Sequence, residues 1–394
     1  MKYIQLGIRY NLLHLFYLVL STCLREINLI LIYEIFNINS SLIYCIIMFL
    51  AEMTFGMFFL FFSNCLNKKK YEQEKYKGKI ELIEGKRIFH QRRAHPIILF
   101  FILFMGSYFD FESYIIPTYA LPRIKKHISI SLDVRIRPLF IIFSSLISRF
   151  SFENQYGKHQ KLSLLIISIN FIIMVSYEFG IQYYVGKQYI EELIYSLVIV
   201  VFEYVLLSIH NNEAKYLMDI QYVNQYKVLF IEGSFGLIPS IITFCLSRNY
   251  EVFENINGSI GLLIFLLFTF YILCGIKNIY ACMTIKLYSS TTYAMCELIV
   301  VPFLMIYYYI RYKEKGNFTA HFVINMSLSI INFFFSCVYN ELLILNFCNL
   351  SYDTYLCVSQ RASLNLHEME KAQKNEFNNS LDESFDFTEM NNIN

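Results

Sequence analysis

Apolar residues fill ten long stretches of this chain, and shorter polar segments separate them. A helix needs about 20 mostly apolar residues to cross the hydrocarbon core of a bilayer. Two stretches break the pattern, because Arg25 and Glu26 interrupt the first and charged residues open the fourth. The pattern predicts an all-α polytopic membrane protein, with about ten transmembrane helices over 10–34, 41–63, 95–118, 128–149, 160–179, 189–209, 226–247, 259–279, 288–310 and 321–345.

Composition agrees with a lipid environment. The chain has 394 residues, of which 56% are apolar and 16% are charged, and its mean hydropathy is +0.44. Soluble domains carry about 25% charged residues, so a soluble core of this size could not bury so much apolar surface. The net charge of +2 gives no sign of a nucleic-acid partner.

The residue types that build enzyme and metal sites are present without the required spacing. The ten cysteines lie mostly inside apolar stretches, and no C-x-x-C pair occurs. The eight histidines include no pair at metal-ligand spacing and no H-E-x-x-H sequence. We therefore expect no cofactor, no metal and no enzymatic activity. A membrane-embedded enzyme would need a His or Asp at membrane depth with a partner, and the sequence offers no such pair.

Loop charge predicts the orientation. The loop 64–94 lies in a segment, from Asn64 to His95, that contains ten Lys and Arg residues, which favours the cytosolic side. Ten crossings would then place both termini in the cytosol. Three glycosylation sequons fall in loops on the opposite side, at Asn39, Asn257 and Asn317. Basic residues at 123–126 and 311–315 argue against this orientation.

The helices divide into two groups of five. We expect a first five-helix repeat over 1–179, a second over 180–350, and a disordered, acidic cytosolic tail over 351–394. An odd number of crossings per repeat forces the two repeats into opposite orientations. A weak internal similarity supports this division, since hydroxyl-rich segments at 129–133 and 289–293 are each followed by a proline.

Charged residues inside the apolar stretches point to function. A bilayer makes such groups costly, so a helix that keeps them usually turns them toward a polar cavity or a partner. This predicts a protein that moves or senses something polar. The interruptions that stand out are Glu52, Asp110, Glu112, Asp133, Arg135, Arg137, Glu232 and Glu297.

Two segments could contact a polar solute. Arg137 has a planar fork of donors that suits phosphate or carboxylate, although an arginine that snorkels from a loop is an equally good interpretation. Lys286 opens a polar segment in which Thr291 and Thr292 could cap a helix. Further along this helix, Thr292 and Tyr293 share a face with Glu297, and ordinary capping beside a hydrogen-bonded Glu is the alternative.

A third segment concerns packing or gating. Gly233 and Gly236 are three residues apart on one helical face, which permits close helix packing. Glu232 must find a partner in the same helix, and Lys215 at the membrane edge or a bound substrate could supply it. We expect the glycines to be structural, and Glu232 with Lys215 to form a gating or stabilising pair. Glu52 is assigned to the same gating or structural group.

Several short sequences together resemble the drug/metabolite transporter superfamily. Phe49-Leu50-Ala51-Glu52-Met53 is similar to the F-L-G-E-F of one branch, and Glu232-Gly233-Ser234-Phe235-Gly236 matches its E-G-L-F-G at four of five positions. That branch is the nucleotide-sugar-transporter-like solute carrier family 35, subfamily F, member 6 type. The remaining similarities are Arg137 in its M-L-R-G, Glu213 to Tyr216 in its E-E-K-F, Lys286 to Thr292 in its K-x-x-S-x-T-T, and Tyr339-Asn340-Glu341 in its Y-N-E.

The resemblance covers residues 41–350 and implies two inverted five-helix lobes around a central substrate site. Two departures affect the cargo. Tyr293 stands where the family has Arg, and the family's next basic position falls near Val300, with Glu297 in place of the Asp between them. If the family's arginines hold a nucleotide phosphate, this chain carries something less anionic.

Together these observations predict a secondary transporter that moves a small polar or anionic solute, such as a nucleotide sugar or a related metabolite, by alternating access. The expected partners are this solute and the lipid bilayer, and a homodimer is left open. The resemblance favours an endomembrane (Golgi, ER or lysosome/vacuole), while the plasma membrane stays open. The rival hypothesis is a chemoreceptor or other non-transporting receptor, which seven crossings with an external N-terminus would favour.

Overall fold

The computed structural model describes residues 4–6, 11–36, 38, 41–66, 96–124, 136–152, 156–185, 189–221, 223–247, 259–312, 318–346, 348, 350–354 and 357–358. The loop 64–94 lies almost entirely outside these residues, and so do the asparagines of the three sequons and nearly all of the acidic tail.

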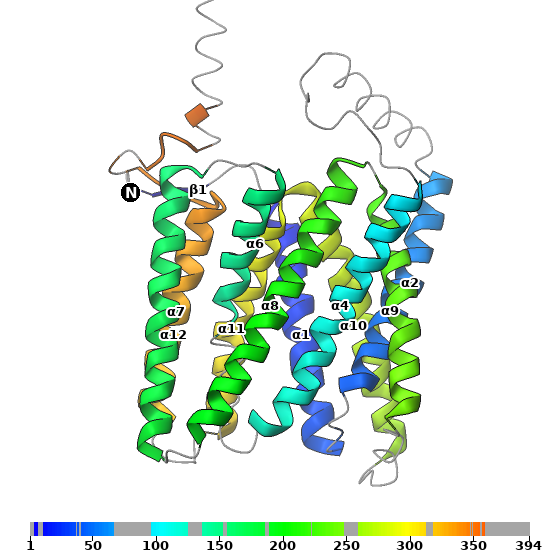
Figure 1. Cartoon of the computed structure of the whole chain (residues 1–394), viewed down its shortest axis with the longest axis horizontal. Coiled ribbons are helices and arrows are strands. Elements are labelled where there is room, and N and C mark those ends of the chain that lie inside the picture. Colours follow the sequence, from blue (N-terminus) through cyan, green and yellow to red (C-terminus); the bar gives the residue numbers. More distant parts are fainter. Residues whose placement is uncertain are drawn as a thin grey trace, which may run out of the picture.

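The described residues form a bundle of long helices with two short strands at one end (Figure 1). The elements are β1 (Ile4–Leu6), α1 (Leu12–Phe36), α2 (Ser41–Leu66), α4 (Pro96–Ile124), α6 (Pro138–Phe152), α7 (Lys158–Val185), α8 (Tyr189–Asp219), α9 (Gln225–Leu246), α10 (Ile260–Leu287), α11 (Ser290–Tyr312), α12 (Phe318–Tyr339) and β2 (Leu343–Leu345).

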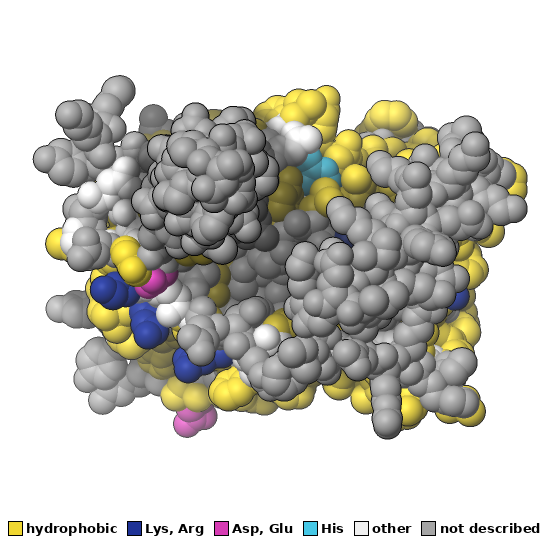
Figure 2. Space-filling view, turned by 90° about the horizontal axis from the view of Figure 1, so that it is seen from above, with side chains coloured by type: hydrophobic (Ala, Val, Ile, Leu, Met, Phe, Trp, Pro, Cys, Tyr) yellow, Lys and Arg dark blue, Asp and Glu magenta, His cyan; other side chains and the backbone are white. Residues whose placement is uncertain are grey.

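The length and apolar composition of the helices indicate a multi-pass membrane protein. Within the described residues, eight helices are long and apolar enough to cross a membrane, namely α1, α2 and α7 to α12. Large apolar side chains remain exposed on their outer faces, such as Phe61 at 66% and Leu246 at 79%. Seen from one end, hydrophobic side chains crowd the outer edge of the molecule (Figure 2). Lipid would cover this surface, because soluble monomers rarely expose so much apolar area.

The helices follow the predicted ranges, with two corrections. As predicted, the first helix continues through Arg25 and Glu26 without a break. The fourth begins at Pro138 rather than at 128, and 128–135 lie outside the described residues. Proline suits the first position of a helix because its missing N–H would have no partner there. The last helix ends at Tyr339 and the chain then enters β2, so the prediction of helix to 345 is wrong.

The two strands join the two ends of the helical part of the chain. β1 pairs with β2 in an antiparallel arrangement, with Gln5 opposite Ile344. β1 lies at the upper end of the bundle in Figure 1. The segments before α1 and after α12 are therefore on the same side of the membrane.

Helices distant in sequence pack side by side. α2 packs along α9, α4 along α8 and α1 along α10, and α7 contacts α12 at one edge of the bundle (Figure 1). A large apolar core lies between the helices, and the fully buried Ile136 and Ile141 belong to it together with Leu18 and Ile167. The predicted repeat boundary at 179 falls inside α7, so a boundary between two groups of helices would lie at 186–188.

Glycines make the close contact between α2 and α9 possible. A β-carbon at Gly233 would lie 2.8 Å from Cβ of Glu52, and one at Gly56 would lie 2.6 Å from the backbone nitrogen of Phe230. A β-carbon at Gly236 would meet the ring of Phe49. Real β-carbons do not approach other atoms this closely, so the packing role expected of Gly233 and Gly236 agrees with the structure.

We expect Gly233→Ala to lower the free energy of unfolding by about 1–3 kcal/mol, because the added methyl group pushes α9 away from α2. Gly180→Ala on α7 is the matched control, since no atom lies within 4 Å of a β-carbon there. Alanine forms helix better than glycine by up to about 1 kcal/mol, so the control should be unchanged or more stable. Thermal unfolding in detergent measures both, and equal effects would contradict the packing role.

Candidate functional site

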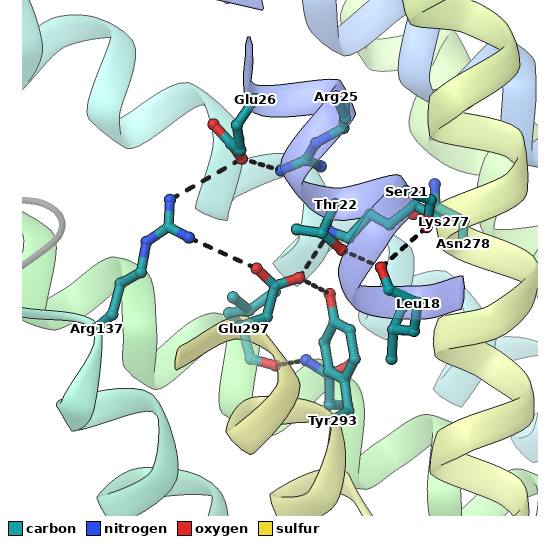
Figure 3. A network of polar contacts seen from close by, with 12 residues as sticks. Leu18, Ser21, Thr22, Arg25, Glu26, Arg137, Lys277, Asn278, Tyr293 and Glu297 are labelled. Carbon is teal, nitrogen blue, oxygen red and sulfur yellow. Dashed lines mark hydrogen bonds and ion pairs between the residues drawn. The ribbon is translucent and has the colours of Figure 1, made fainter. Parts of the chain in front are cut away.

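A network of five charged side chains lies inside the bundle, between α1, α6, α10 and α11 (Figure 3). Glu297 on α11 is its centre, with Oε2 3.7 Å from a guanidinium nitrogen of Arg137 and Oε1 3.1 Å from Nζ of Lys277. Arg137 also lies 3.9 Å from Glu26, which in turn pairs with Arg25. We call these five residues, with Tyr293, the first polar centre.

Tyr293 completes the centre on the side of α11. Its hydroxyl donates a 2.9 Å hydrogen bond to Oε1 of Glu297, and Nζ of Lys277 lies 5.6 Å from its ring centroid. The tyrosine thus orients the carboxylate and offers its ring face to the lysine, an arrangement that favours the cation.

The helices place this centre deep in the protein. Arg25 and Glu26 lie near the middle of α1, and Arg137 immediately precedes α6, which has 15 residues and is about 22 Å long. The start of α6 therefore lies well inside the bundle, and a helix start carries a partial positive charge. The charged side chains are 4% to 14% exposed. Charges this well buried persist only when partners compensate them.

The charges do not cancel. Arg25, Arg137 and Lys277 supply three positive charges. Glu26 and Glu297 supply two negative charges, so these five described side chains have a net charge of +1. Arg137 lies 3.7 and 3.9 Å from its two carboxylates, farther than a hydrogen bond. A positively charged centre with guanidinium and ammonium donors is suited to an anion.

The structure brings together three of the five residues predicted to contact the solute, namely Arg137, Tyr293 and Glu297. Lys286 does not join them. It lies at the end of α10, two and a half turns beyond Lys277, and its backbone carbonyl accepts a 2.9 Å hydrogen bond from Lys215.

Thr292 belongs to a separate network of hydroxyl and amide groups at the end of the bundle that carries β1 and β2. Thr291 and Thr292 donate to Oδ1 of Asn340 at 3.1 and 3.2 Å, and Ser290 donates to Asn212 at 2.8 Å. The network joins the start of α11 to the end of α12 and to α8. We expect it to hold this end of the bundle together rather than to contact a solute.

The cap of α11 differs from the prediction. Ser289 precedes the helix, and its Oγ accepts a 3.0 Å hydrogen bond from the backbone N–H of Thr292. Ser289 is therefore the capping residue, and the threonines lie in the first turn. Serine before a helix with a partner three residues on is the usual arrangement.

A second polar centre lies on the other side of α10. His210 on α8 is 4.0 Å from Asp110 on α4 and 4.0 Å from Glu232 on α9. Glu52 on α2 accepts a 2.7 Å hydrogen bond from Asn278 on α10. We call Glu52, Asp110, His210, Glu213 and Glu232 the second polar centre, since Glu232 lies within electrostatic range of the other three carboxyl groups.

The predicted pair of Lys215 and Glu232 is wrong. Lys215 lies 2.8 Å from Asp219, one turn further along α8, while Glu232 faces His210. The sequence already placed Asp219 within reach of Lys215, because a lysine four residues before an acid lies close to it in a helix.

Sequence reasoning missed Lys277, Glu26 and His210 as members of these centres. Lys277 stands in the apolar stretch from Ile260 to Cys282, and the rule that singled out Glu232 applies equally to it. Glu26 was treated as an interruption of the first helix. His210 lies at the end of an apolar stretch, where a histidine carries little signal.

Comparisons with known proteins add no relative. No protein-family model matches the chain, and no curated protein is detectably similar to it. Within the described residues, no group of three or more His, Cys, Asp or Glu is placed to hold a metal ion.

Proposed function

We propose that the chain is a secondary transporter of the drug/metabolite type, which moves a small anionic solute by alternating access between two inverted five-helix lobes. The first polar centre carries this proposal. A buried centre with three basic and two acidic side chains, contributed by α1, α6, α10 and α11, has a net attraction for an anion. A carboxylate or phosphate of the solute would replace Glu26 or Glu297 beside Arg137.

The pattern of helix contacts supports the inverted lobes. If α1, α2, α4, α6 and α7 are matched in order with α8 to α12, the contact of α1 with α10 corresponds to that of α8 with α4. In the same way, the contact of α1 with α11 corresponds to that of α8 with α6. The contact of α2 with α10 corresponds to that of α9 with α4. Five helices per lobe give opposite orientations, the arrangement on which alternating access is often built. Five crossings per lobe require α4 and α6 to cross the membrane as well, in addition to the eight helices identified by length and hydropathy.

The paired strands count against the receptor with seven crossings. Because β1 and β2 lie on one side, the number of crossings between them must be even. The proposed ten crossings satisfy this requirement. An endomembrane location rests on the family resemblance and is proposed on that ground alone.

The first test is thermal unfolding of the purified protein in detergent with nucleotide sugars, nucleotides, amino acids and organic anions. A ligand at about 100 times its Kd stabilises the native state by about 2.7 kcal/mol. We expect one class of anion to raise the unfolding temperature of the wild type, and this shift to disappear in Arg137→Gln and Lys277→Met.

Arg149→Gln is the matched control, because Arg149 lies near the far end of α6, the helix that Arg137 precedes. Its side chain is exposed, and its Cζ lies 5.0 Å from the ring centroid of Tyr156. Its shift should equal that of the wild type. Uptake of the stabilising compound into proteoliposomes then separates transport from binding. Stabilisation that survives in Arg137→Gln would remove the first polar centre as the solute site.

A further inference from the structure

The second polar centre concentrates acidic groups in the interior of the protein. Three of its carboxyl-bearing side chains are almost completely buried, since Glu232 is 3%, Asp110 is 4% and Glu52 is 7% exposed. The imidazole of His210 lies 4.0 Å from two of these groups, Asp110 and Glu232. Placing an unpaired charge in such an environment costs several kcal/mol, and like charges at short range add to the cost.

The polar atoms of this centre are incompletely satisfied. Oε1 of Glu232, Oε1 of Glu213, Oε2 of Glu52 and Nδ1 of His210 are buried and lack a hydrogen-bond partner. Glu232 nevertheless faces His210 at 4.0 Å. Buried polar atoms without a partner are rare in native proteins and occur at functional sites or where a water or an ion binds.

Glycine makes room for one of these carboxyl groups. A β-carbon at Gly106 on α4 would lie 2.5 Å from Oε1 of Glu213, so any larger residue would displace the glutamate. The chain therefore accommodates Glu213 inside the contact between α4 and α8, within electrostatic range of Glu232.

A proton fits this centre better than a metal ion. Among the described residues, no three His, Cys, Asp or Glu side chains are placed to hold a metal ion together. A proton needs only one acceptor at a time, and carboxyl and imidazole groups are the usual carriers of protons inside membranes.

We propose that Asp110, His210 and Glu232, with Glu52 and Glu213, form a proton-binding site that couples proton movement to the anion at the first polar centre. The coupling rests on the proposed transport function, whereas proton binding does not. A proton from the aqueous phase binds one carboxylate, which becomes a neutral carboxylic acid. The same proton leaves when the site faces the opposite side, so no other bond changes.

Helix α10 connects the two centres. Lys277 pairs with Glu297 in the first centre, while the next residue, Asn278, donates to Glu52 in the second. Lys277 also lies within electrostatic range of Glu52 and Asp110. The charge of Lys277 is therefore shared between the two centres, and it favours the ionised forms of both carboxyl groups.

The direction of the coupling follows from this shared charge. An anion at the first centre screens Lys277, so the ionised forms of Glu52 and Asp110 lose stabilisation and bind a proton more readily. By reciprocity, protonation strengthens anion binding by the same factor. Anion and proton would then move together. Other ionisable groups close to the second centre are the buried thiols of Cys45, Cys274 and Cys282.

The test uses proteoliposomes on a sensor that records charge movement after a step to lower pH, with no solute present. We expect a transient current in the wild type that falls to the level of empty liposomes in Asp110→Asn and Glu232→Gln. Glu112→Gln is the matched control, since Glu112 is half-buried two residues from Asp110 on α4 and is not part of the centre. It should retain the current.

A second measurement needs no variant. Infrared spectra of the wild type should contain the carbonyl band of a protonated carboxyl group, and this band should change with pH. A wild type with neither the current nor the band would overturn the proposal, and so would a current that follows sodium concentration at constant pH.

The outcomes separate this proposal from the proposed function. Anion stabilisation that depends on Arg137, without proton current, would leave the transporter and remove the proton site. Proton current in a protein that no solute stabilises would support the proton site and count against the transporter. If both occur, anion binding should tighten as the pH falls, and Asn278→Ala should weaken this dependence.

Discussion

Glu297→Ala is expected to lower the free energy of unfolding by about 3–5 kcal/mol, the largest effect predicted for this protein. The substitution leaves Arg137 and Lys277 buried without the carboxylate that both contact, at 3.7 and 3.1 Å. Only Glu26 would then oppose three positive charges. Thermal unfolding in detergent measures the loss, and Glu191→Ala, at an exposed position on α8, should show almost none.

A double substitution tests the electrostatic origin of this loss. Lys277→Met with Glu297→Gln removes one charge of each sign, so the net charge of the first polar centre is unchanged. Replacing both members of a buried ion pair is often neutral or even stabilising. We expect the double variant to lose about 1–3 kcal/mol less free energy of unfolding than the sum of the losses in Lys277→Met and Glu297→Gln. Additive losses would show that Lys277 and Glu297 act independently.

Asn340→Leu is expected to lower the free energy of unfolding by about 1–3 kcal/mol. Its Oδ1 accepts hydrogen bonds from Thr291 and Thr292, and its Nδ2 donates at 3.0 Å to the backbone carbonyl of Ser336. Leucine has a similar size but leaves both hydroxyl groups buried without their acceptor. Thermal unfolding measures this loss too. Ser327→Ala is the control, because this exposed serine on α12 bonds only within its own helix.

Replacing the polar side chains that face Leu at position 340 with apolar ones should recover part of the lost stability. If Thr291 and Thr292 are changed to valine in the Asn340→Leu background, no threonine hydroxyl is left without its acceptor, and the loss should shrink. A triple variant less stable than Asn340→Leu alone would show that the threonines contribute through other contacts, such as those with Ser289.

The sequence predicted the helices well because hydropathy is a local property of about 20 residues. It placed the start of the fourth helix too early, since charges and a proline near 133–138 are compatible with either a loop or a helix start. It also could not predict β1 and β2, because each has three residues and finds its partner across the whole helical part of the chain.

The candidate sites were predicted in part, for a related reason. The cost of a charge in lipid marks Glu52, Asp110, Arg137, Glu232 and Glu297 one by one. It does not say which helices are neighbours. The hydrogen bond from Asn278 to Glu52 joins residues 226 positions apart, and only the packing of α2 against α10 brings them together. Lys215 is a different case, because its partner Asp219 lies one turn away on the same helix.

The strand pair also has a consequence for how the protein is made. β1 precedes every described helix and β2 follows the last of them, so a ribosome synthesises the two partners at opposite ends of the process. β1 must therefore wait unpaired until α1 to α12 have entered the membrane. Their pairing marks the moment when insertion is complete, and a truncated or misinserted chain would present an unpaired strand to the cell's quality control.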